Sequence, residues 1–221
     1  MSHIPRNSRT RAFIPALNRR WLTPLYDPLI RWTMREDVFK PALVQQAQIL
    51  PGHRVLDLGC GTATLTILIK QRHPEATVLG VDIDPRILSM AREKIARAGV
   101  EIPLDEGAAT ELPYPDETFD RILSSLVFHH LCPRDKLTAA REAFRVLRPG
   151  GTLHVADFGP PQSALMAVVT LWMRYFEETR DHFAGRLSAV FGQAGFTPVE
   201  VTWRYSTFFG PLALYRARRP A

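Results

Sequence analysis

The segment VLDLGCGTATLT, residues 55–66, constrains the fold of this chain more than any other. An apolar run enters the turn Gly59-Cys60-Gly61, and a helical pattern leaves it. A second apolar run ends in the carboxylates of VDID, residues 81–84, one strand–helix–strand unit later. Glycines let a backbone approach a ligand closely, and the following helix offers unpaired N–H groups at its N-terminus. The pattern predicts a nucleotide-binding turn in an α/β sheet.

Strand-like and helix-like segments alternate from residue 55 onward. This alternation predicts an α/β fold with a doubly wound, mostly parallel sheet and helices on both faces. We expect strands at residues 54–58, 77–81, around 104, 119–125 and 152–157, and helices at 64–72, 85–98 and 135–147. Two more strands, at 196–202 and 207–217, are expected to add an antiparallel C-terminal edge.

Length and composition fit a single domain. The chain has 221 residues, of which 46% are hydrophobic, enough to bury a sizeable core. Prolines interrupt the first 50 residues too often for a separate domain. We therefore expect a helical N-terminal cap over residues 1–50, a cofactor-binding core over 51–158, and lid helices with C-terminal strands over 159–221.

No segment has the pattern of a membrane span or a targeting signal. The richest apolar run, residues 164–173, is shorter than the roughly 18 to 20 residues that cross a bilayer. The N-terminus lacks the apolar core of a secretory signal, so we expect a cytoplasmic protein. Cys60 and Cys132 have no metal-ligand spacing, and neither a metal site nor a disulfide is expected.

The net charge of +6 comes from the two ends of the chain. Solvated, partly frayed termini would explain it. The basic ends could instead steer an anionic substrate or lie on an anionic membrane. Binding to nucleic acid is not expected, because no base-reading motif accompanies the arginines. The arginines before Asp27 or after Glu200, with no acid among them, are Arg6, Arg9, Arg11, Arg19, Arg20, Arg204, Arg216, Arg218 and Arg219.

Two residues of the glycine segment distinguish between cofactors. A dinucleotide fingerprint reads G-x-G-x-x-G or A, and its third small residue lets helix and strand pack closely. This chain has Thr64 at that position. Asp57, two residues before Gly59, would repel the phosphates of a dinucleotide but would hold an ammonium group. The segment therefore favours a nucleoside that carries an amino acid over NAD.

Several sequence blocks occur in the order of a known family. They are YDPL at Tyr26, VLDLGCGTATLT at Val55, GVDID at Gly80, ELPYPDETFD at Glu111, LSSLVFHHL at Leu123, RVLRPGGTL at Arg145 and QAGF at Gln193. With these blocks the chain resembles the class I S-adenosylmethionine-dependent methyltransferases (type 11-like), in the group that includes the ubiquinone/menaquinone-biosynthesis methyltransferases. The resemblance spans residues 26–196. It implies a Rossmann-like fold, S-adenosyl-L-methionine as methyl donor and S-adenosyl-L-homocysteine as product.

The resemblance also implies where the cofactor binds. The turn Gly59-Cys60-Gly61 would pass under its methionine part, with Asp57 supporting the turn or the ammonium. The family often has Gly where this chain has Ala63, a change that a backbone cradle should tolerate. It often has Asp or Asn where this chain has Ala108, which leaves one adenine hydrogen bond to backbone or water. The other matched positions are Asp82 at the ribose, Ile83 on the adenine, Ala108 and Ala109 near the adenine amino group, Thr66 and Ser125 near the methionine end, and Tyr26 closing the site.

Several of these residues also have structural explanations. Asp57 could tie the glycine turn together through backbone N–H groups. Asp84 is favoured as a helix cap because Pro85 follows it, and Asp120 as a structural residue where a strand begins. Three aromatic residues at helical spacing would ordinarily pack in a core, but they could also line an apolar lid. They are Trp172, Tyr175 and Phe176.

A general base is useful when the methyl acceptor loses a proton, as a hydroxyl or an activated ring carbon does. His129 and His130 follow the expected strand at 119–125, and we expect one of them to act as base or to orient the substrate. Neighbouring side chains on an extended chain point to opposite sides, so only one should face the site. His154 is expected to be structural. Weaker candidates for the base are Tyr26, Asp157, Tyr175 and His182.

The sequence favours methyl transfer to a small, apolar or aromatic acceptor, at oxygen, carbon or nitrogen. One alternative is a phospholipid amine methylated at an anionic membrane, which the basic N-terminus would contact peripherally. Another is an inactive scaffold that binds S-adenosylmethionine, to which only Ala108 points. An oxidoreductase that uses NAD is disfavoured by Thr64. The sequence leaves the oligomeric state open.

Overall fold

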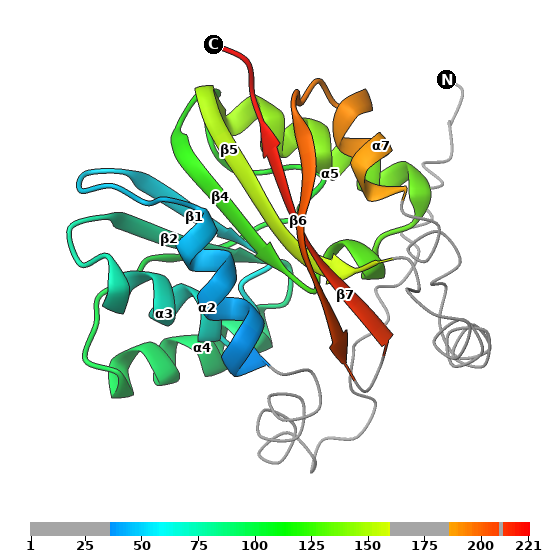
Figure 1. Ribbon diagram of the computed structural model, residues 1–221. Coiled ribbons are helices and arrows are strands. Elements are labelled where there is room, and N and C mark those ends of the chain that lie inside the picture. Colours follow the sequence, from blue (N-terminus) through cyan, green and yellow to red (C-terminus); the bar gives the residue numbers. More distant parts are fainter. Residues whose placement is uncertain (1–35, 160–185, 208–209) are drawn as a thin grey trace, which may run out of the picture.

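A computed structural model describes residues 36–159, 186–207 and 210–221. Its strands are β1 (Arg54–Leu58), β2 (Thr77–Asp82), β3 (Leu104–Glu106), β4 (Phe119–Ser125), β5 (Leu147–Phe158), β6 (Val199–Thr207) and β7 (Gly210–Arg218). They form one sheet in the order β3-β2-β1-β4-β5-β7-β6 (Figure 1). The first five strands pair in parallel, and β7 pairs antiparallel with both β5 and β6. The predicted parallel sheet with an antiparallel C-terminal edge is confirmed.

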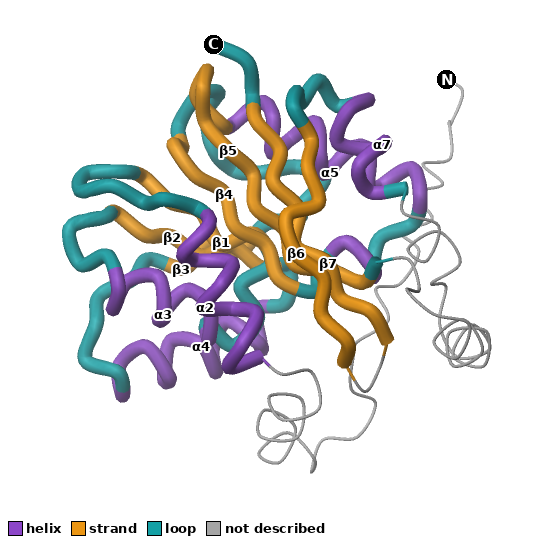
Figure 2. The backbone as a smooth tube through the Cα atoms, viewed as in Figure 1, coloured by secondary structure: helices purple, strands orange, loops and turns teal. Residues whose placement is uncertain are grey.

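Helices cover both faces of this sheet, as the tube in Figure 2 shows. They are α2 (Glu36–Gln46), α3 (Thr64–Arg72), α4 (Pro85–Arg97), α5 (Pro133–Val146) and α7 (Leu187–Gln193), with a short 3₁₀ turn η1 (Phe128–His130). Side chains of α2 and α3 share one apolar core with the sheet, and side chains of α5 and α7 share the other. The α4 helix packs on α3 through Ala91 and Ile95.

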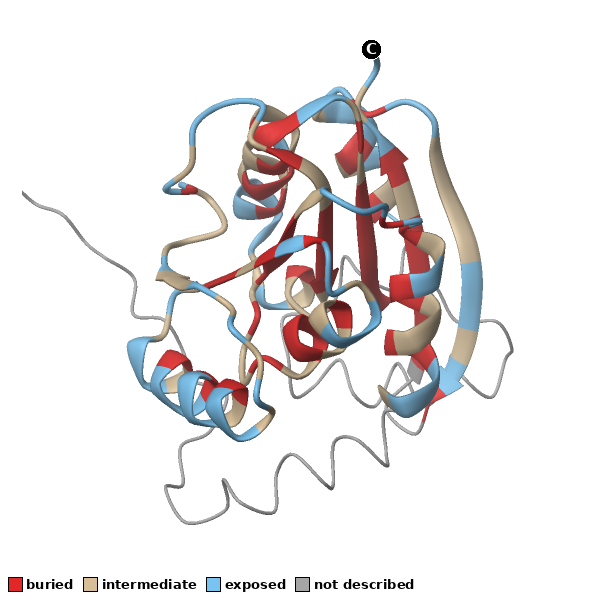
Figure 3. Ribbon diagram, turned by 90° about the vertical axis from the view of Figure 1, so that its left-hand side faces the viewer, coloured by how far each residue is buried: buried red, intermediate tan, exposed pale blue. Residues whose placement is uncertain are grey.

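The central strand β1 shows why the sheet is buried on both faces. Its side chains alternate, so that Val55 packs with α2 and α3, whereas Leu56 and Leu58 pack with α5. Apolar residues at successive positions are typical of a strand covered on both sides. Figure 3 shows the central strands buried, whereas the edge strand β6 is partly exposed and the helices expose their outer faces. The one carboxylate in this run, Asp57, is buried as well.

The α4 helix begins and ends close to where its sequence predicts. The Asp84 side chain accepts a hydrogen bond from the backbone N–H of Arg86 at 2.9 Å, and Pro85 occupies the first helical position. The cap satisfies an N–H group that has no partner inside the helix. The predicted capping role of Asp84 is confirmed. Asp120 is confirmed as structural too, because its carboxylate accepts from the Arg54 backbone N–H and from Arg148.

The last three strands begin at other residues than predicted, β6 and β7 later and β5 earlier. β6 begins at Val199 instead of Phe196, because the Phe196 ring packs edge-on against Phe144 and Phe191 in the core. β5 begins at Leu147, directly after α5, although the proline–glycine turn at 149–151 predicts a loop there. Residues after β7 supply hydrogen-bond partners for this turn, since the Gly150 N–H donates to the carbonyls of residues 219 and 220.

The expectation of a solvated C-terminus is wrong for Arg219, whereas Arg216 stays 43% exposed although it is paired. The Arg219 guanidinium donates to the carbonyls of Phe144, Arg145 and Leu147 at the end of α5, and it pairs with Glu117 at 2.7 Å. A cation at the C-terminal end of a helix also interacts favourably with the helix dipole. Arg216 pairs with Glu200 at 2.6 Å. In the part of the chain that the structure describes, no helix is both long and apolar enough to cross a membrane.

Candidate functional site

The glycine turn is fixed to the end of the neighbouring strand by its backbone. The N–H groups of Gly59 and Cys60 both donate to the carbonyl of Val81, at 2.9 and 3.0 Å. The N–H of Gly61 donates to Asp82 Oδ2 at 2.9 Å. These bonds connect β1 to β2 at the point where both strands end, so the turn is held rigidly at the carboxyl edge of the sheet. Ligands of open α/β sheets bind at this edge.

The two glycines of the turn have different surroundings. Both have positive φ, 71° at Gly59 and 53° at Gly61. A Cβ on Gly59 would overlap the side chain of Val127, whereas a Cβ on Gly61 would meet nothing within 4 Å. Gly61 therefore leaves open space in front of its backbone. Ala63 also has a positive φ of 61°, which is uncommon for a residue with a side chain.

Asp57 lies beneath this turn and is only 1% exposed. Its Oδ2 accepts a hydrogen bond from the Thr66 hydroxyl on α3 at 2.6 Å, and Thr66 is itself fully buried. Burial raises the pKa of Asp57 to about 6, against the opposing effects of the Thr66 hydrogen bond and the charge of Lys40. Lys40, on α2, also pairs with Glu36 at 2.7 Å. A buried carboxylate whose charge is only partly compensated is well suited to an added cation.

Asp82 ends β2 and carries two backbone hydrogen bonds. Its Oδ2 accepts from Gly61, and its Oδ1 accepts from the N–H of Asp84 at 3.1 Å. Each carboxylate oxygen has a second lone pair, so both can also accept from a hydroxyl of a ligand. Ile83 follows directly and is 46% exposed, which is unusual for a large aliphatic side chain. This pair offers an acceptor for a sugar and an apolar surface for a flat ring.

Ala108 and Ala109 lie after β3 at the same edge, and both are half-buried. The Ala108 carbonyl accepts from the N–H of Glu111 at 3.0 Å, and these two residues form an isolated antiparallel bridge. The N–H of Gly107 donates to the Asp82 carbonyl at 3.0 Å, which ties the segment to the end of β2. Only backbone groups and methyl groups are available at these two alanines.

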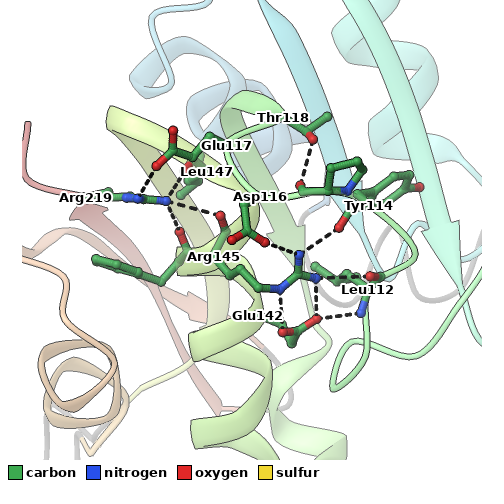
Figure 4. A network of polar contacts seen from close by, with 11 residues as sticks. Leu112, Tyr114, Asp116, Glu117, Thr118, Glu142, Arg145, Leu147 and Arg219 are labelled. Atoms are coloured by element: carbon green, nitrogen blue, oxygen red, sulfur yellow. Dashed lines mark hydrogen bonds and ion pairs between the residues drawn. The ribbon is translucent and has the colours of Figure 1, made fainter.

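Arg145, on α5, holds the loop that follows these alanines (Figure 4). Its guanidinium donates to both carboxylate oxygens of Glu142, at 2.8 and 2.7 Å, and to Asp116 at 2.8 Å. It also donates to the carbonyls of Leu112 and Tyr114. The hydrogen bonds to Glu142 and Asp116 raise the pKa of Arg145 further above its usual range. One planar side chain therefore fixes a loop rich in turn residues.

The end of β4 contributes a polar atom that needs a partner. The Ser125 hydroxyl is buried and has no hydrogen-bond partner in the part of the chain that the structure describes. Ser124, its neighbour, is different, because its hydroxyl donates to the Leu58 carbonyl at 2.9 Å. Buried hydroxyls without partners are rare, since each costs about 1–3 kcal/mol. The Ser125 hydroxyl marks a place where a ligand could supply the missing bond.

The two histidines follow β4, as predicted, but they lie in the 3₁₀ turn η1, so the expectation of an extended chain with side chains on opposite sides is wrong. In this turn the His129 and His130 rings lie side by side, with centroids 3.8 Å apart. His129 Nδ1 is 3.1 Å from Asp157 Oδ1, and its side chain is 9% exposed. His130 is exposed. The structure therefore brings together His129 and Asp157, which the sequence analysis treats as separate candidates.

His154 is buried inside β5, as the sequence predicts, and its Nε2 lies 2.9 Å from the Thr152 hydroxyl. Burial lowers the pKa of His154 to about 3, and the charges of Arg121 and Arg216 act in the same direction. The histidine is therefore neutral and structural. The other candidates, Tyr26, Trp172, Tyr175, Phe176 and His182, lie outside the described residues.

Sequence reasoning missed two residues of this site. Lys40 carries a detectable signal, since it lies four residues after Glu36 on a helix. Arg145 carries a weaker one, three residues after Glu142, but its partners in the loop are about 30 residues away in sequence.

Among the described residues, no group of three or more histidine, cysteine, aspartate or glutamate side chains is placed to hold a metal ion.

These observations fit S-adenosylmethionine. The open space at Gly61 suits a methionine chain, and the buried Asp57 carboxylate suits its ammonium. Asp82 retains acceptor capacity for ribose hydroxyls, and the exposed Ile83 suits an adenine face. The Ser125 hydroxyl, which has no partner among the described residues, lies at the same sheet edge. Cys60 contributes its backbone N–H to the turn. Burial raises the pKa of its thiol, which therefore stays protonated.

Comparisons with known proteins lead to methyltransferases. A methyltransferase domain family matches residues 55–151. A demethylmenaquinone methyltransferase of Thermus thermophilus is 36% identical over 148 residues, which cover 67% of this chain and 66% of the relative, just under two thirds of its length. A demethylmenaquinone methyltransferase of Listeria monocytogenes is 30% identical over 210 residues, covering 80% of this chain and 85% of the relative.

A solved structure extends the match to the fold. The S-adenosylmethionine-dependent methyltransferase SibL superposes with a TM-score of 0.73 at 25% identity, covering 94% of this chain and 60% of that one. The fold, the glycine turn with its two carboxylates and the sequence matches all lead to one family. The chain belongs to the class I S-adenosylmethionine-dependent methyltransferases.

Proposed function

We propose that this chain transfers a methyl group from S-adenosylmethionine to a small, apolar or aromatic acceptor. One arrangement carries the proposal. The open space at Gly61, the unpartnered Ser125 hydroxyl and the His129 turn all lie at the carboxyl edge of the same sheet. A cradle for the donor and a candidate base for the acceptor are thus within one site. An inactive scaffold would need only the cradle.

The cofactor would be held mainly by its amino-acid and ribose parts. When bound, S-adenosylmethionine supplies the electrophilic methyl carbon. Asp57 is suited to the ammonium and Asp82 to the ribose hydroxyls. Lys40 is close enough to Asp57 to lower the pKa of that carboxyl, and its ammonium is suited to the carboxylate of the methionine part of the cofactor. At Ala108 the adenine amino group would meet a backbone carbonyl or water, since the side chain has no acceptor.

We assign the role of general base to His129 in preference to His130. Its ring is nearly buried and held by Asp157, whereas His130 is exposed. A general base gains from a fixed position, because proton transfer needs the acceptor atom within hydrogen-bond distance. His130 would then support the His129 ring, because the centroids of the two rings are 3.8 Å apart.

The acceptor class rests on the relatives. The Thermus and Listeria relatives carry the name demethylmenaquinone methyltransferase. We propose an aromatic ring of this kind as the first acceptor to test. A phospholipid amine is the alternative, and its methylation would require a membrane surface as the source of the acceptor. Both acceptors lose a proton on methylation, the ring carbon directly and the lipid amine from its ammonium form, so the labelled product and not the need for His129 distinguishes them.

The test is methyl transfer from radiolabelled S-adenosylmethionine to a short-chain demethylmenaquinone, kept reduced to its hydroquinone so that the ring carbon is nucleophilic, or to phosphatidylethanolamine vesicles. We expect labelled product from the first acceptor and none from the vesicles. His129→Gln should lower kcat by about 100-fold or more, the usual contribution of a general base. His130→Gln is the matched control and should retain most of the activity. Labelled lipid with unlabelled quinone would contradict the proposal, and so would a fully active His129→Gln.

A further inference from the structure

The Asp157 carboxylate at the end of β5 is completely buried, and two backbone N–H groups and one imidazole nitrogen of the described residues lie within hydrogen-bond distance of it. The His129 backbone N–H donates to Oδ2 at 3.2 Å, and the Phe158 backbone N–H donates to Oδ1 at 2.8 Å. The third group is His129 Nδ1, 3.1 Å from Oδ1. A carboxylate has no hydrogen to donate, so the form that matches these three partners is the ionised one.

The partner of Nδ1 fixes the state of the His129 ring. Because a carboxylate only accepts, Nδ1 must carry the hydrogen in this contact. In a neutral imidazole the lone pair then belongs to Nε2. The hydrogen bond from the His129 backbone N–H to the same carboxylate holds the backbone of His129 next to Asp157, so the ring stays beside the carboxylate. One buried side chain therefore determines both the orientation of the ring and the nitrogen that can take up a proton.

The segment that leads into the His129 turn packs against the glycine turn through Val127. Leu126, the residue after β4, has a positive φ of 59°, an uncommon conformation for leucine. It directs Val127 into the space that Gly59 leaves by having no side chain. Phe128 is fully buried, and its ring packs edge-on against Phe191 of α7. The position of His129 is therefore fixed relative to the segment that would hold the methyl donor.

We propose that Asp157 is the positioning residue of this methyltransferase, holding His129 with Nδ1 protonated so that Nε2 receives the proton of the acceptor. The inference rests on the proposed function. As the carbon–sulfur bond breaks, its electron pair goes to sulfur, and the acceptor atom bonds to the methyl carbon. The proton that the acceptor loses goes to Nε2, and the resulting imidazolium faces the Asp157 carboxylate. Solvent takes the proton after product release.

Among the described residues, two titratable side chains lie close to this pair. His130 packs its ring on His129, and Tyr215, on β7, is near enough for the charge of Asp157 to act on it. Burial, together with that charge, raises the pKa of Tyr215 to about 12, so the phenol stays protonated. Tyr215 therefore does not compete as a base at neutral pH.

The first test reads the tautomer in the unliganded protein. Long-range ¹H–¹⁵N spectra of histidine-labelled protein distinguish a ring protonated at Nδ1 from one protonated at Nε2, and His129→Gln assigns the signal. We expect His129 to be protonated at Nδ1 at pH 8. A ring protonated at Nε2 would overturn the proposal. This measurement needs neither cofactor nor acceptor, so it does not depend on the proposed function.

The second test replaces the carboxylate. In Asp157→Asn only one of the two terminal atoms can accept, so either the backbone N–H of His129 or its Nδ1 meets an NH₂ group. We expect kcat to fall at least about tenfold and the Nδ1-protonated signal to shrink, as in other pairs where an amide favours the wrong tautomer. Affinity for S-adenosylhomocysteine should stay unchanged, because Asp157 is not assigned to the cofactor.

Asp120→Asn is the matched control. It makes the same chemical change on the same sheet, but where β4 begins, at the opposite edge. It should alter neither kcat nor the His129 signal. If Asp157→Asn keeps both the wild-type kcat and the wild-type spectrum, the proposal is wrong. If the protein fails to bind S-adenosylhomocysteine, the proposed function fails instead, and the spectra still report on the pair.

Discussion

At the level of single residues, Gly59 and Gly61 have similar backbones but different neighbours. Both need positive φ, which disfavours any side chain. Only Gly59 also needs its missing Cβ for packing, because Val127 occupies that space. Gly61 has open space where the ligand is expected. The two glycines should therefore respond differently to the same substitution.

Gly59→Ala should lower the free energy of unfolding by about 3 kcal/mol, through overpacking and a left-handed alanine together. Gly61→Ala should lower it by about 1–2 kcal/mol, since only the backbone effect applies. Its main effect should be on ligand affinity, because the new methyl group would enter the cradle. Urea titrations measure the first quantity and calorimetry with S-adenosylhomocysteine the second. Unchanged affinity in Gly61→Ala would contradict the assigned cradle.

Asp57 should make stability depend on pH. Its pKa is raised from 3.8 to about 6 on folding, so the fold favours the protonated form. This contribution is full below pH 3.8 and is lost as the pH rises through 6. A tenfold change in proton affinity corresponds to about 1.4 kcal/mol, so between pH 4 and pH 7 wild type should lose up to about 3 kcal/mol relative to Asp57→Asn. Denaturant titrations of both proteins at several pH values measure this difference.

Asp120→Asn is the control, because the pKa of its carboxyl moves in the opposite direction. Burial would raise the pKa of Asp120, but the hydrogen bonds from the Arg54 backbone and from Arg148 together lower it. Its contribution to stability should therefore be present above pH 3.8 and lost as the pH falls further. A difference of the same sign for Asp57→Asn and Asp120→Asn would contradict the assigned environments.

At the level of elements, the loop between β3 and β4 depends on one side chain. Arg145→Met should leave the carbonyls of Leu112 and Tyr114 without their shared donor. We expect the unfolding free energy to fall by about 1–3 kcal/mol, as for hydrogen bonds to charged groups. Amide hydrogen exchange should speed up over residues 111–118, and affinity for S-adenosylhomocysteine should weaken.

Arg97→Met provides the comparison. Its side chain is 75% exposed, and its guanidinium lies 3.5 Å from the Glu93 carboxylate. Exposed pairs of this kind contribute little to stability. Exchange over residues 111–118 should stay at the wild-type rate in this variant. Equal exchange in the Arg145 and Arg97 variants would show that the loop is held by its own turns.

The sequence predicts elements well where the signals are local. The α4 helix has a clear period, a capping aspartate and a proline at its first position, and its bounds agree with prediction within one residue. The η1 turn has no such signal. It forms because Phe128 is buried and the backbone of His129 binds Asp157, 28 residues away. The relation between the two histidines could therefore not be predicted from their spacing.

At the level of the whole molecule, the alternation of strands and helices predicts the parallel part of the sheet. It does not predict that β7 lies between β5 and β6, since that order depends on pairing between distant segments. Nor does it predict that Arg219 caps α5, because the partners are more than 70 residues apart. The division into a cap, a cofactor-binding core and a lid stays a prediction.

The carboxyl edge of this sheet is where we expect S-adenosylmethionine to bind, and the proposed chemistry depends on it. Isothermal titration calorimetry of the full chain with S-adenosylmethionine, S-adenosylhomocysteine and NAD tests this most directly. We expect both adenosyl ligands to bind with one site per chain, and NAD to give no heat of binding. Asp82→Ala should weaken both adenosyl ligands. Saturable binding of NAD, with no response to either adenosyl ligand, would contradict the assignment of this edge.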